Sequence, residues 1–323
     1  MMSKAAKTFL ILAVCLVVLG GAVFCLAMAA NRWDFGRLGG KLETNTYDVS
    51  SDFHAIAVRC STEDVDFRLS DDGTCRVVCA EREDEKHLVY VQDDTLVIER
   101  EDNREWYEHV SLFTSGSPSI MVYLPRAEYV SLSVEEETGD VTVPKDLLFG
   151  TAEIRLDTGD VDFRASSKGL LRIRTDTGDI HVDGVTAGEM DLSVDTGRVE
   201  VVSAACTGSV SVTVDTGKVF LTDVSCASLT STGNTGDLTL KNVTASDSFS
   251  IVRSTGDVTF DRCDAADLVV ETDTGDVTGS LLTPKIFVTS SDTGRVDVPE
   301  SLTGGRCKIT TDTGDIRITI AGT

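Results

Sequence analysis

Aspartates that precede Thr-Gly are the residues whose type and repetition first suggest chemistry. They occur at Asp157, Asp176, Asp195, Asp215, Asp273, Asp292 and Asp312. Aspartic peptidases present a catalytic carboxylate on such a loop, but two loops must face each other so that two carboxylates share one proton. Parallel repeats would instead place the motifs side by side along one edge. We therefore expect a structural role and no catalytic residues.

The Thr-Gly pairs recur at a fixed interval of 19 or 20 residues. Their glycines are Gly139, Gly159, Gly178, Gly197, Gly217, Gly236, Gly256, Gly275, Gly294 and Gly314. A period of about 20 residues predicts a solenoid, because one coil cannot bury its own apolar face and must stack on the next. Glycine supplies the positive φ that a sharp corner needs, so these ten glycines are predicted to be structural corners.

Apolar residues alternate on both sides of each corner. Val161 and Ile180 lie two residues after a glycine, and Ile154 and Ile173 lie five residues before one. Such alternation is typical of strands with one buried face. The pattern predicts an all-β protein, a single-stranded parallel β-solenoid with two strands per 19–20-residue coil and broad, flat sides.

Aspartate also follows most of the glycines, so two acidic columns should run along one edge. Calcium between neighbouring coils would relieve their repulsion, with Asp157, Asp160, Asp176 and Asp179 as the candidate ligands. Calcium-binding β-rolls, however, use a glycine-paired nonapeptide that is missing from this sequence. A solvated acidic edge is favoured, and no metal or cofactor is expected.

The nine cysteines form no Cys-x-x-Cys pair. With only four scattered histidines, His54, His87, His109 and His181, the sequence does not predict a zinc site. Cys206 and Cys226 share one repeat position and should be stacked neighbours. A free buried pair is favoured, and a disulfide is the alternative.

The formal net charge of −24 excludes nucleic acid as an expected partner, because phosphate would be repelled. Cations, basic proteins and cell-wall polymers with cationic groups remain compatible with this charge. The partner expected is a cell-wall, surface or envelope component.

An uncharged run at residues 8–30 follows Lys4 and Lys7. Its length predicts a transmembrane anchor or uncleaved signal, with residues 1–7 as a cytoplasmic tail. A cleaved signal peptide is the alternative, because Ala27-Met28-Ala29 has the form of a cleavage site. The expected location is a single pass through the cell membrane, with the N-terminus cytoplasmic and the solenoid extracellular.

Three further segments follow this run. Residues 31–46 are expected to be a tether, residues 47–136 an irregular β N-terminal cap, and residues 137–323 the β-solenoid repeats. Within the cap, residues 61–67 resemble a degenerate repeat, and residues 88–98 predict a hairpin.

The C-terminal coil is expected to form the open end of the solenoid. Lys308 and Arg317 should point outward there and block the addition of further strands, which would keep the ectodomain monomeric.

An N-terminal apolar segment, an irregular β region and repeated (D/S)TGD-(V/I)-x-(V/L/F) units resemble the bacterial family labelled "putative adhesin", over residues 47–323. It is a domain of unknown function, often linked to cell-envelope stress systems. The resemblance implies a β-solenoid without established catalytic residues.

These observations favour a non-catalytic, membrane-anchored, extracytoplasmic binding or adhesin-like module of the bacterial cell envelope. The alternative is a structural or regulatory cell-envelope stress protein that acts through a partner membrane protein. A glycan-cleaving solenoid is disfavoured, because the repeats have hardly any Tyr and no Trp to bind sugar rings.

Overall fold

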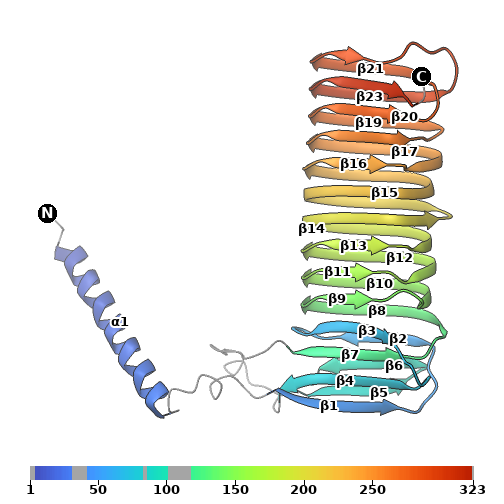
Figure 1. Cartoon of the computed structure of the whole chain (residues 1–323). Coiled ribbons are helices and arrows are strands. Elements are labelled where there is room, and N and C mark those ends of the chain that lie inside the picture. The colour runs from blue at the N-terminus through green and yellow to red at the C-terminus, as the bar shows by residue number, and fades with distance from the viewer. Residues whose placement is uncertain (1–3, 31–41, 83–85, 101–117, 322–323) are drawn as a thin grey trace.

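The computed structural model describes residues 4–30, 42–82, 86–100 and 118–321. It contains one helix, α1 (Lys4–Ala30), and a tall stack of strands (Figure 1). In chain order the strands are β1 (Leu42–Val49), β2 (Ala55–Arg59), β3 (Asp64–Leu69), β4 (Cys75–Arg82), β5 (His87–Gln92), β6 (Thr95–Arg100), β7 (Ser119–Leu124), β8 (Glu128–Thr138), β9 (Val141–Val143), β10 (Leu148–Thr158), β11 (Val161–Phe163), β12 (Ser166–Thr177), β13 (Ile180–Asp183), β14 (Thr186–Cys206), β15 (Ser209–Thr235), β16 (Leu238–Lys241), β17 (Thr244–Thr255), β18 (Val258–Cys263), β19 (Asp267–Thr274), β20 (Val277–Leu281), β21 (Lys285–Thr293), β22 (Val296–Asp297), β23 (Gly305–Thr313) and β24 (Ile316–Ile320).

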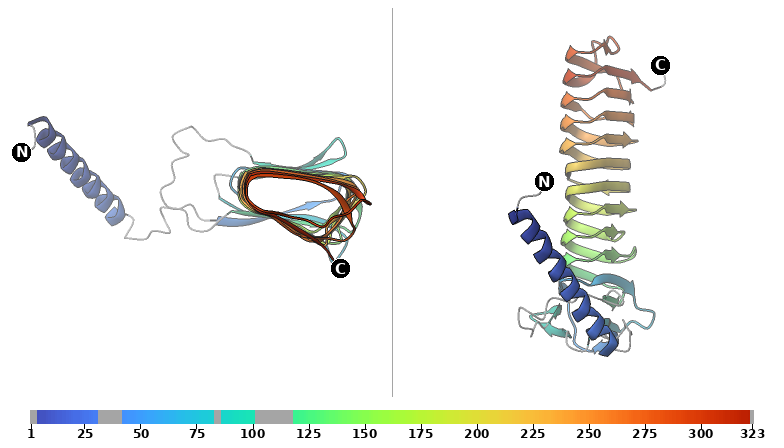
Figure 2. Two further views of the ribbon diagram at one scale, coloured as in Figure 1. Left: turned by 90° about the horizontal axis from the view of Figure 1, so that it is seen from above. Right: turned by 90° about the vertical axis from the view of Figure 1, so that its left-hand side faces the viewer.

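The repeats form the predicted parallel solenoid. Each coil pairs with the next in repeat register, as Val161 does with Ile180 and Thr158 with Thr177. The alternating residues point inward and form one continuous core, in which Ile173 and Phe163 have no exposed surface. Seen along the stack, the coils superimpose in an elongated outline, which gives the solenoid its broad sides (Figure 2).

The cap combines antiparallel and parallel strands. The predicted hairpin is confirmed as β5 and β6, and β4 pairs antiparallel with both β1 and β7. The degenerate repeat is also confirmed, since β2 and β3 pair in parallel with β8 and β9 and form a first coil. Residues 42–46 of the expected tether belong to β1, whereas residues 31–41 lie outside the described part of the chain.

The last coils do not stack in chain order. Strand β23 pairs with β19 on one side and with β21 on the other, and β24 lies between β20 and β22 in the same way. The predicted open C-terminal coil is therefore wrong, because the final strands are inserted below the coil that precedes them. The outermost coil is β21–β22, where Val296 is 44% exposed.

Lys308 and Arg317 consequently lie beside interior strands. Lys308 Nζ is 2.6 Å from Oε1 of Glu271, and Arg317 pairs with Asp315. They neutralise neighbouring carboxylates and do not guard an end of the stack.

A helix needs about 20 consecutive apolar residues to cross the hydrocarbon core of a bilayer. Among the helical residues that the structure describes, none form a segment that is both long enough and apolar enough to do so. The predicted transmembrane anchor at residues 8–30 is therefore wrong, and so is the single-pass location with an extracellular solenoid.

Candidate functional site

The Thr-Gly corners are backbone contacts between neighbouring coils. Gly178 has a φ of 144°, and a Cβ built on it would lie 2.0 Å from the carbonyl oxygen of Gly159. Nine of the ten predicted corner glycines have φ values between 132° and 158°. Gly294, in the outermost coil, is the exception, although a Cβ there would also meet a backbone oxygen. These positions need glycine for conformation and for space.

The aspartates that follow the glycines form a hydrogen-bonded ladder. The backbone N–H of Asp160 donates to Oδ1 of Asp140 at 2.8 Å, and that of Asp179 donates to Oδ1 of Asp160 at 2.7 Å. The ladder extends down to Asp64 and up to Arg198, whose backbone N–H donates to Asp179 but whose guanidinium cannot accept a bond from the next coil. This column has a structural role that the repeat pattern alone did not reveal.

The aspartates that precede Thr-Gly are different. Asp157 and Asp176 are exposed, whereas Asp160 and Asp179 are committed to the ladder. Neighbouring coils place the Asp-Thr-Gly motifs side by side, as predicted, and not face to face. Among the described residues, no three of the four candidate calcium ligands converge on a common point.

The ladder predicts unequal effects for two neighbouring aspartates. Asp160→Ala removes an acceptor from the N–H of Asp179 and should lower the free energy of unfolding by about 1 kcal/mol. Asp176→Ala removes an exposed carboxylate and should change it by less than about 0.5 kcal/mol. Urea denaturation of both variants measures the difference. Equal losses would contradict the ladder.

One column of inward positions carries a carboxylate at the base of the solenoid, where the next coils carry leucine, threonine and valine. Leu156 occupies this position in β10, and its partner in β8 is Glu136. In the coil below, Arg59 pairs with Glu135. The next residue, Cys60, therefore lies beside Glu136 in the same column. Cys60 is only 8% exposed and Glu136 only 5%. A buried carboxylate beside a buried thiol is costly unless it has a partner, so this end of the column is a candidate site.

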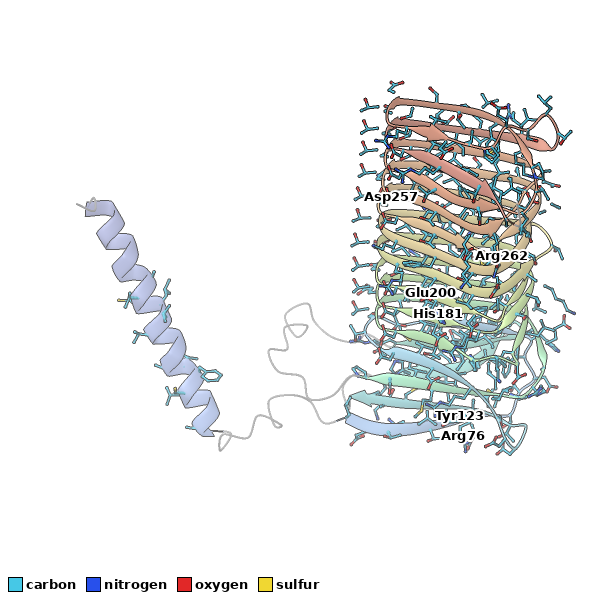
Figure 3. All side chains as sticks on the ribbon, turned by 45° about the horizontal axis from the view of Figure 1, so that its top comes forward. Arg76, Tyr123, His181, Glu200, Asp257 and Arg262 are labelled. Atoms are coloured by element: carbon cyan, nitrogen blue, oxygen red, sulfur yellow. The ribbon has the colours of Figure 1, made fainter. Side chains whose placement is uncertain are left out.

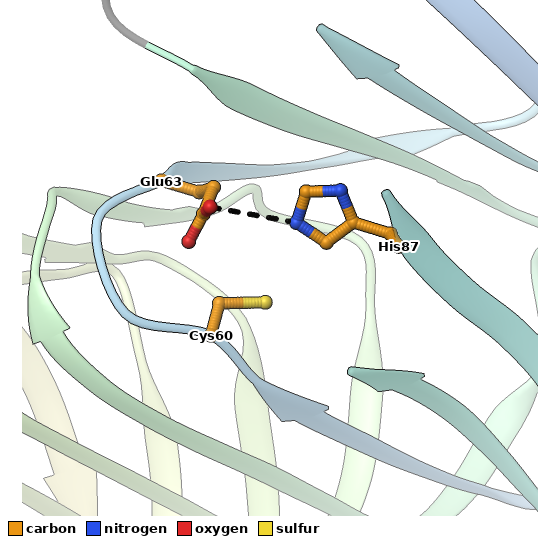
Figure 4. Close-up of side chains that lie close together, drawn as sticks. All are labelled: Cys60, Glu63 and His87. Carbon is orange, nitrogen blue, oxygen red and sulfur yellow. Dashed lines mark ion pairs between the residues drawn. The ribbon is translucent and has the colours of Figure 1, made fainter. Parts of the chain in front are cut away.

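A buried group that we call the His87 cluster lies at this point and comprises Cys60, Glu63, Cys79, Glu81 and His87. The Nδ1 atom of His87 lies 2.6 Å from Oε2 of Glu81, and its Nε2 atom lies 3.6 Å from Oε1 of Glu63 (Figure 4). Both glutamate side chains and the imidazole are at most 2% exposed. Each cysteine lies beside the ring with one glutamate, so the ring separates two thiol–carboxylate pairs.

Burial and hydrogen bonding compete within the His87 cluster. Burial opposes ionisation of Glu63, but His87 and the N–H groups of Thr62 and Ser61 lower the pKa of this carboxyl to about 2. Burial also opposes a charged His87, yet the surrounding thiols and carboxylates raise its pKa far above the ordinary value. The carboxylates therefore call for one positive charge beside them, which either a proton on the ring or a bound cation supplies.

Burial has the largest effect on the pKa values of Cys60 and Glu136. Burial raises the pKa of the Cys60 thiol to about 11. Burial, with the nearby Glu63, raises the pKa of Glu136 to about 8. Additional negative charge at the cluster is thus disfavoured unless a cation accompanies it.

A surface cavity of about 590 Å³ leads to this region. Cys60, Arg100 and Glu136 line it, together with Arg155 and Asp157 of the first full repeats. The cavity thus lies between the cap and the first repeats and reaches Cys60.

The broad faces of the solenoid carry paired surface groups. His181 and Glu200 come from adjacent coils on one face, with Nδ1 and Oε2 3.8 Å apart (Figure 3). Near the base, the guanidinium of Arg76 lies 5.0 Å from the ring centre of Tyr123. Contacts of this kind between exposed side chains contribute little to stability.

Cys206 and Cys226 occupy neighbouring coils, as predicted, and both are buried as free thiols. Burial raises the pKa of Cys206 to about 11 and that of Cys226 to about 12. Thiols with such pKa values are poor nucleophiles at neutral pH.

Sequence reasoning missed the His87 cluster, because its members come from the β2–β3 connection, β4 and β5. Their spacing matches no zinc-binding motif, and the scattered histidines argued against a metal. His109 lies outside the described residues. One signal was present: Glu63 stands at the position that glycine takes in the later corners, next to the ladder residue Asp64.

The fold and this site define a class of protein: a parallel β-solenoid closed by a mixed β cap with a buried polar cluster. A family model described as Toastrack DUF4097 matches residues 53–217 and 207–323. The chain belongs to this family, which agrees with the resemblance drawn from its repeats.

Several solved structures are similar to the chain. A "putative adhesin" from Bacteroides fragilis is 14% identical with a TM-score of 0.42, over 86% of this chain and 97% of that one. A "putative lipid binding protein" from Parabacteroides distasonis is 13% identical with a TM-score of 0.43, over 75% and 96%. A "putative cell adhesion protein" from Clostridium sporogenes is 11% identical with a TM-score of 0.27, over 87% and 100%. A search of curated proteins finds no match.

Proposed function

We propose that the protein is a non-catalytic, adhesin-like binding module of the cell envelope that recognises a cationic partner through one edge of its solenoid. The observation that carries the proposal is the column of exposed aspartates that precede Thr-Gly. The aspartates that follow the glycines accept hydrogen bonds within the ladder. The aspartates that precede Thr-Gly are not part of the ladder, so their carboxylates can bind a ligand.

The upper part of the edge shows this arrangement most simply. Asp273, Asp312 and Asp292 are exposed and follow one another in space, because their threonine neighbours pair across the last three coils. Consecutive coils set such carboxylates about 4.8 Å apart. A flexible polycation can place one charge against each of them, which adds to the long-range attraction from a net charge of −24.

The proposal predicts site-specific binding of a short oligolysine peptide to the full chain. Replacing Asp273, Asp292 and Asp312 with asparagine should weaken binding by about tenfold, since each exposed ion pair contributes about 0.5 kcal/mol. Isothermal titration at low ionic strength measures the change. The melting temperature should stay unchanged, because these side chains are exposed.

A matched variant separates the edge from net charge. Glu189→Gln, Asp247→Asn and Asp261→Asn also remove three exposed carboxylates, but these lie away from the Thr-Gly edge. Oligolysine affinity should then fall by less than about twofold. If both triple variants lose the same affinity, the attraction comes from net charge alone and the proposed edge is wrong.

A further inference from the structure

We propose that Cys60, Glu63 and His87 form a zinc-binding site inside the base of the solenoid. Sγ of Cys60, a carboxylate oxygen of Glu63 and a ring nitrogen of His87 all lie within 4.8 Å of one another (Figure 4). The proposal concerns a site apart from the acidic edge.

The first argument is the orientation of the imidazole. The Nδ1–H of His87 donates to Oε2 of Glu81, which leaves Nε2 facing Glu63. Glu81 is itself held by Asn45, whose Nδ2 lies 2.5 Å from Oε1, and by the hydroxyl of Tyr47 at 3.0 Å. A carboxylate that fixes the distal nitrogen of a histidine is a common outer support of metal sites, because it sets the tautomer and increases the basicity of the ligand.

The second argument is an atom without a partner. Within the described part of the chain, Nε2 of His87 is buried and makes no hydrogen bond. Opposite it, Glu63 uses Oε2 to accept the N–H groups of Ser61 and Thr62, so Oε1 is directed toward the ring. A buried nitrogen facing a buried carboxylate oxygen calls for a cation between them or a proton on the nitrogen.

Distance separates these two possibilities. A protonated His87 bridging two glutamates should hydrogen-bond to both, yet its contact to Glu63 is 3.6 Å and its contact to Glu81 is 2.6 Å. A distance of 3.6 Å is too long for an N–H···O hydrogen bond. Two tetrahedral ligands of one zinc ion, at about 2.0–2.2 Å from it, are about 3.4 Å apart. The contact to Glu63 therefore fits a shared ion, whereas the contact to Glu81 is a hydrogen bond.

The ligand types select the metal. A thiol, an imidazole and a carboxylate together suit zinc, because calcium and magnesium prefer oxygen ligands alone. Two anionic ligands would balance the charge of the ion. The guanidinium of Arg100 lies 3.6 Å from Oε1 of Glu63 and stabilises the negative charge of this carboxylate.

A water molecule would have to supply the fourth coordination position, because the site has three protein ligands. Of these three, Cys60 also lines the cavity, so water would approach the ion from that side. Three protein ligands with one open position are typical of accessible zinc sites and less so of purely structural ones.

Cobalt(II) titration of the reduced full chain tests the site, because cobalt reports a thiolate ligand through a charge-transfer absorption band. We expect one cobalt per chain with this band, and its loss when zinc is added. A chain that gives no band, or only non-stoichiometric binding, overturns the proposal.

Variants then assign the ligands. Cys60→Ser should abolish the band, and Glu63→Gln should weaken zinc binding at least tenfold while the band persists at high cobalt. Cys307→Ser is the matched control, since Cys307 is also a buried free thiol but lies far along the stack. Retention of the band in folded Cys60→Ser, or its loss in Cys307→Ser, contradicts the assignment. Should Cys60→Ser fail to fold by circular dichroism, the Glu63→Gln affinity decides, and an unchanged value overturns the site.

Discussion

Replacing Gly178 with alanine should lower the free energy of unfolding by about 3 kcal/mol or more. The new Cβ would lie 2.0 Å from the carbonyl oxygen of Gly159, and the φ of 144° belongs to a region that only glycine adopts readily. Backbone strain of about 1–3 kcal/mol and overpacking of similar size both contribute. Denaturation in urea, monitored by circular dichroism, measures the loss.

Gly184 provides the control in the same coil. It has a positive φ of 69°, but a Cβ there would meet nothing within 4 Å. Gly184→Ala should therefore cost only the conformational penalty of about 1 kcal/mol. If the two variants are equally stable, close contact between coils does not determine the corner.

Ile316→Asp should destabilise the protein by about 4 kcal/mol or more, and Val296→Asp by about 1 kcal/mol. Both residues lie two positions after a corner glycine, but Ile316 is fully buried between Val277 and Val296, whereas Val296 is 44% exposed. Burying an unpaired carboxylate is costly, and an exposed one stays solvated.

This pair tests the order of the last coils. If the coils followed chain order, Val296 would be interior and Ile316 would be at the end, so the costs would be reversed. Thermal unfolding of the two variants under the same conditions decides between the two arrangements. A larger loss for Val296→Asp would refute the insertion of β23 and β24.

The repeat architecture could be predicted because it depends on local pattern. The phase of residues such as Ile154 and Val161 repeats with every corner. Both are buried, and among the residues two positions after a corner glycine the exception is Val296 in the outermost coil. The structural role of the ladder aspartates could not be predicted. An aspartate that accepts a hydrogen bond from the next coil and an aspartate that is only solvated occur in the same sequence pattern.

Non-local pairing accounts for most of what could not be predicted. The repeat pattern does not show whether β23 stacks on top of β21 or is inserted between β19 and β21. In both arrangements the same alternating residues of β23 point inward. The His87 cluster likewise depends on strands that approach one another only after the cap has folded. The transmembrane anchor was inferred from one uncharged run.

The inserted C-terminal strands also determine how the molecule should respond to mechanical load. In a stack assembled in chain order, tension on the last strand would peel coils off one at a time from the tip. Here β24 is held on both sides, by β20 and by β22. Force applied through β24 must therefore shear two ladders of hydrogen bonds at once, and the outermost coil would be released only after the strand beneath it had been extracted.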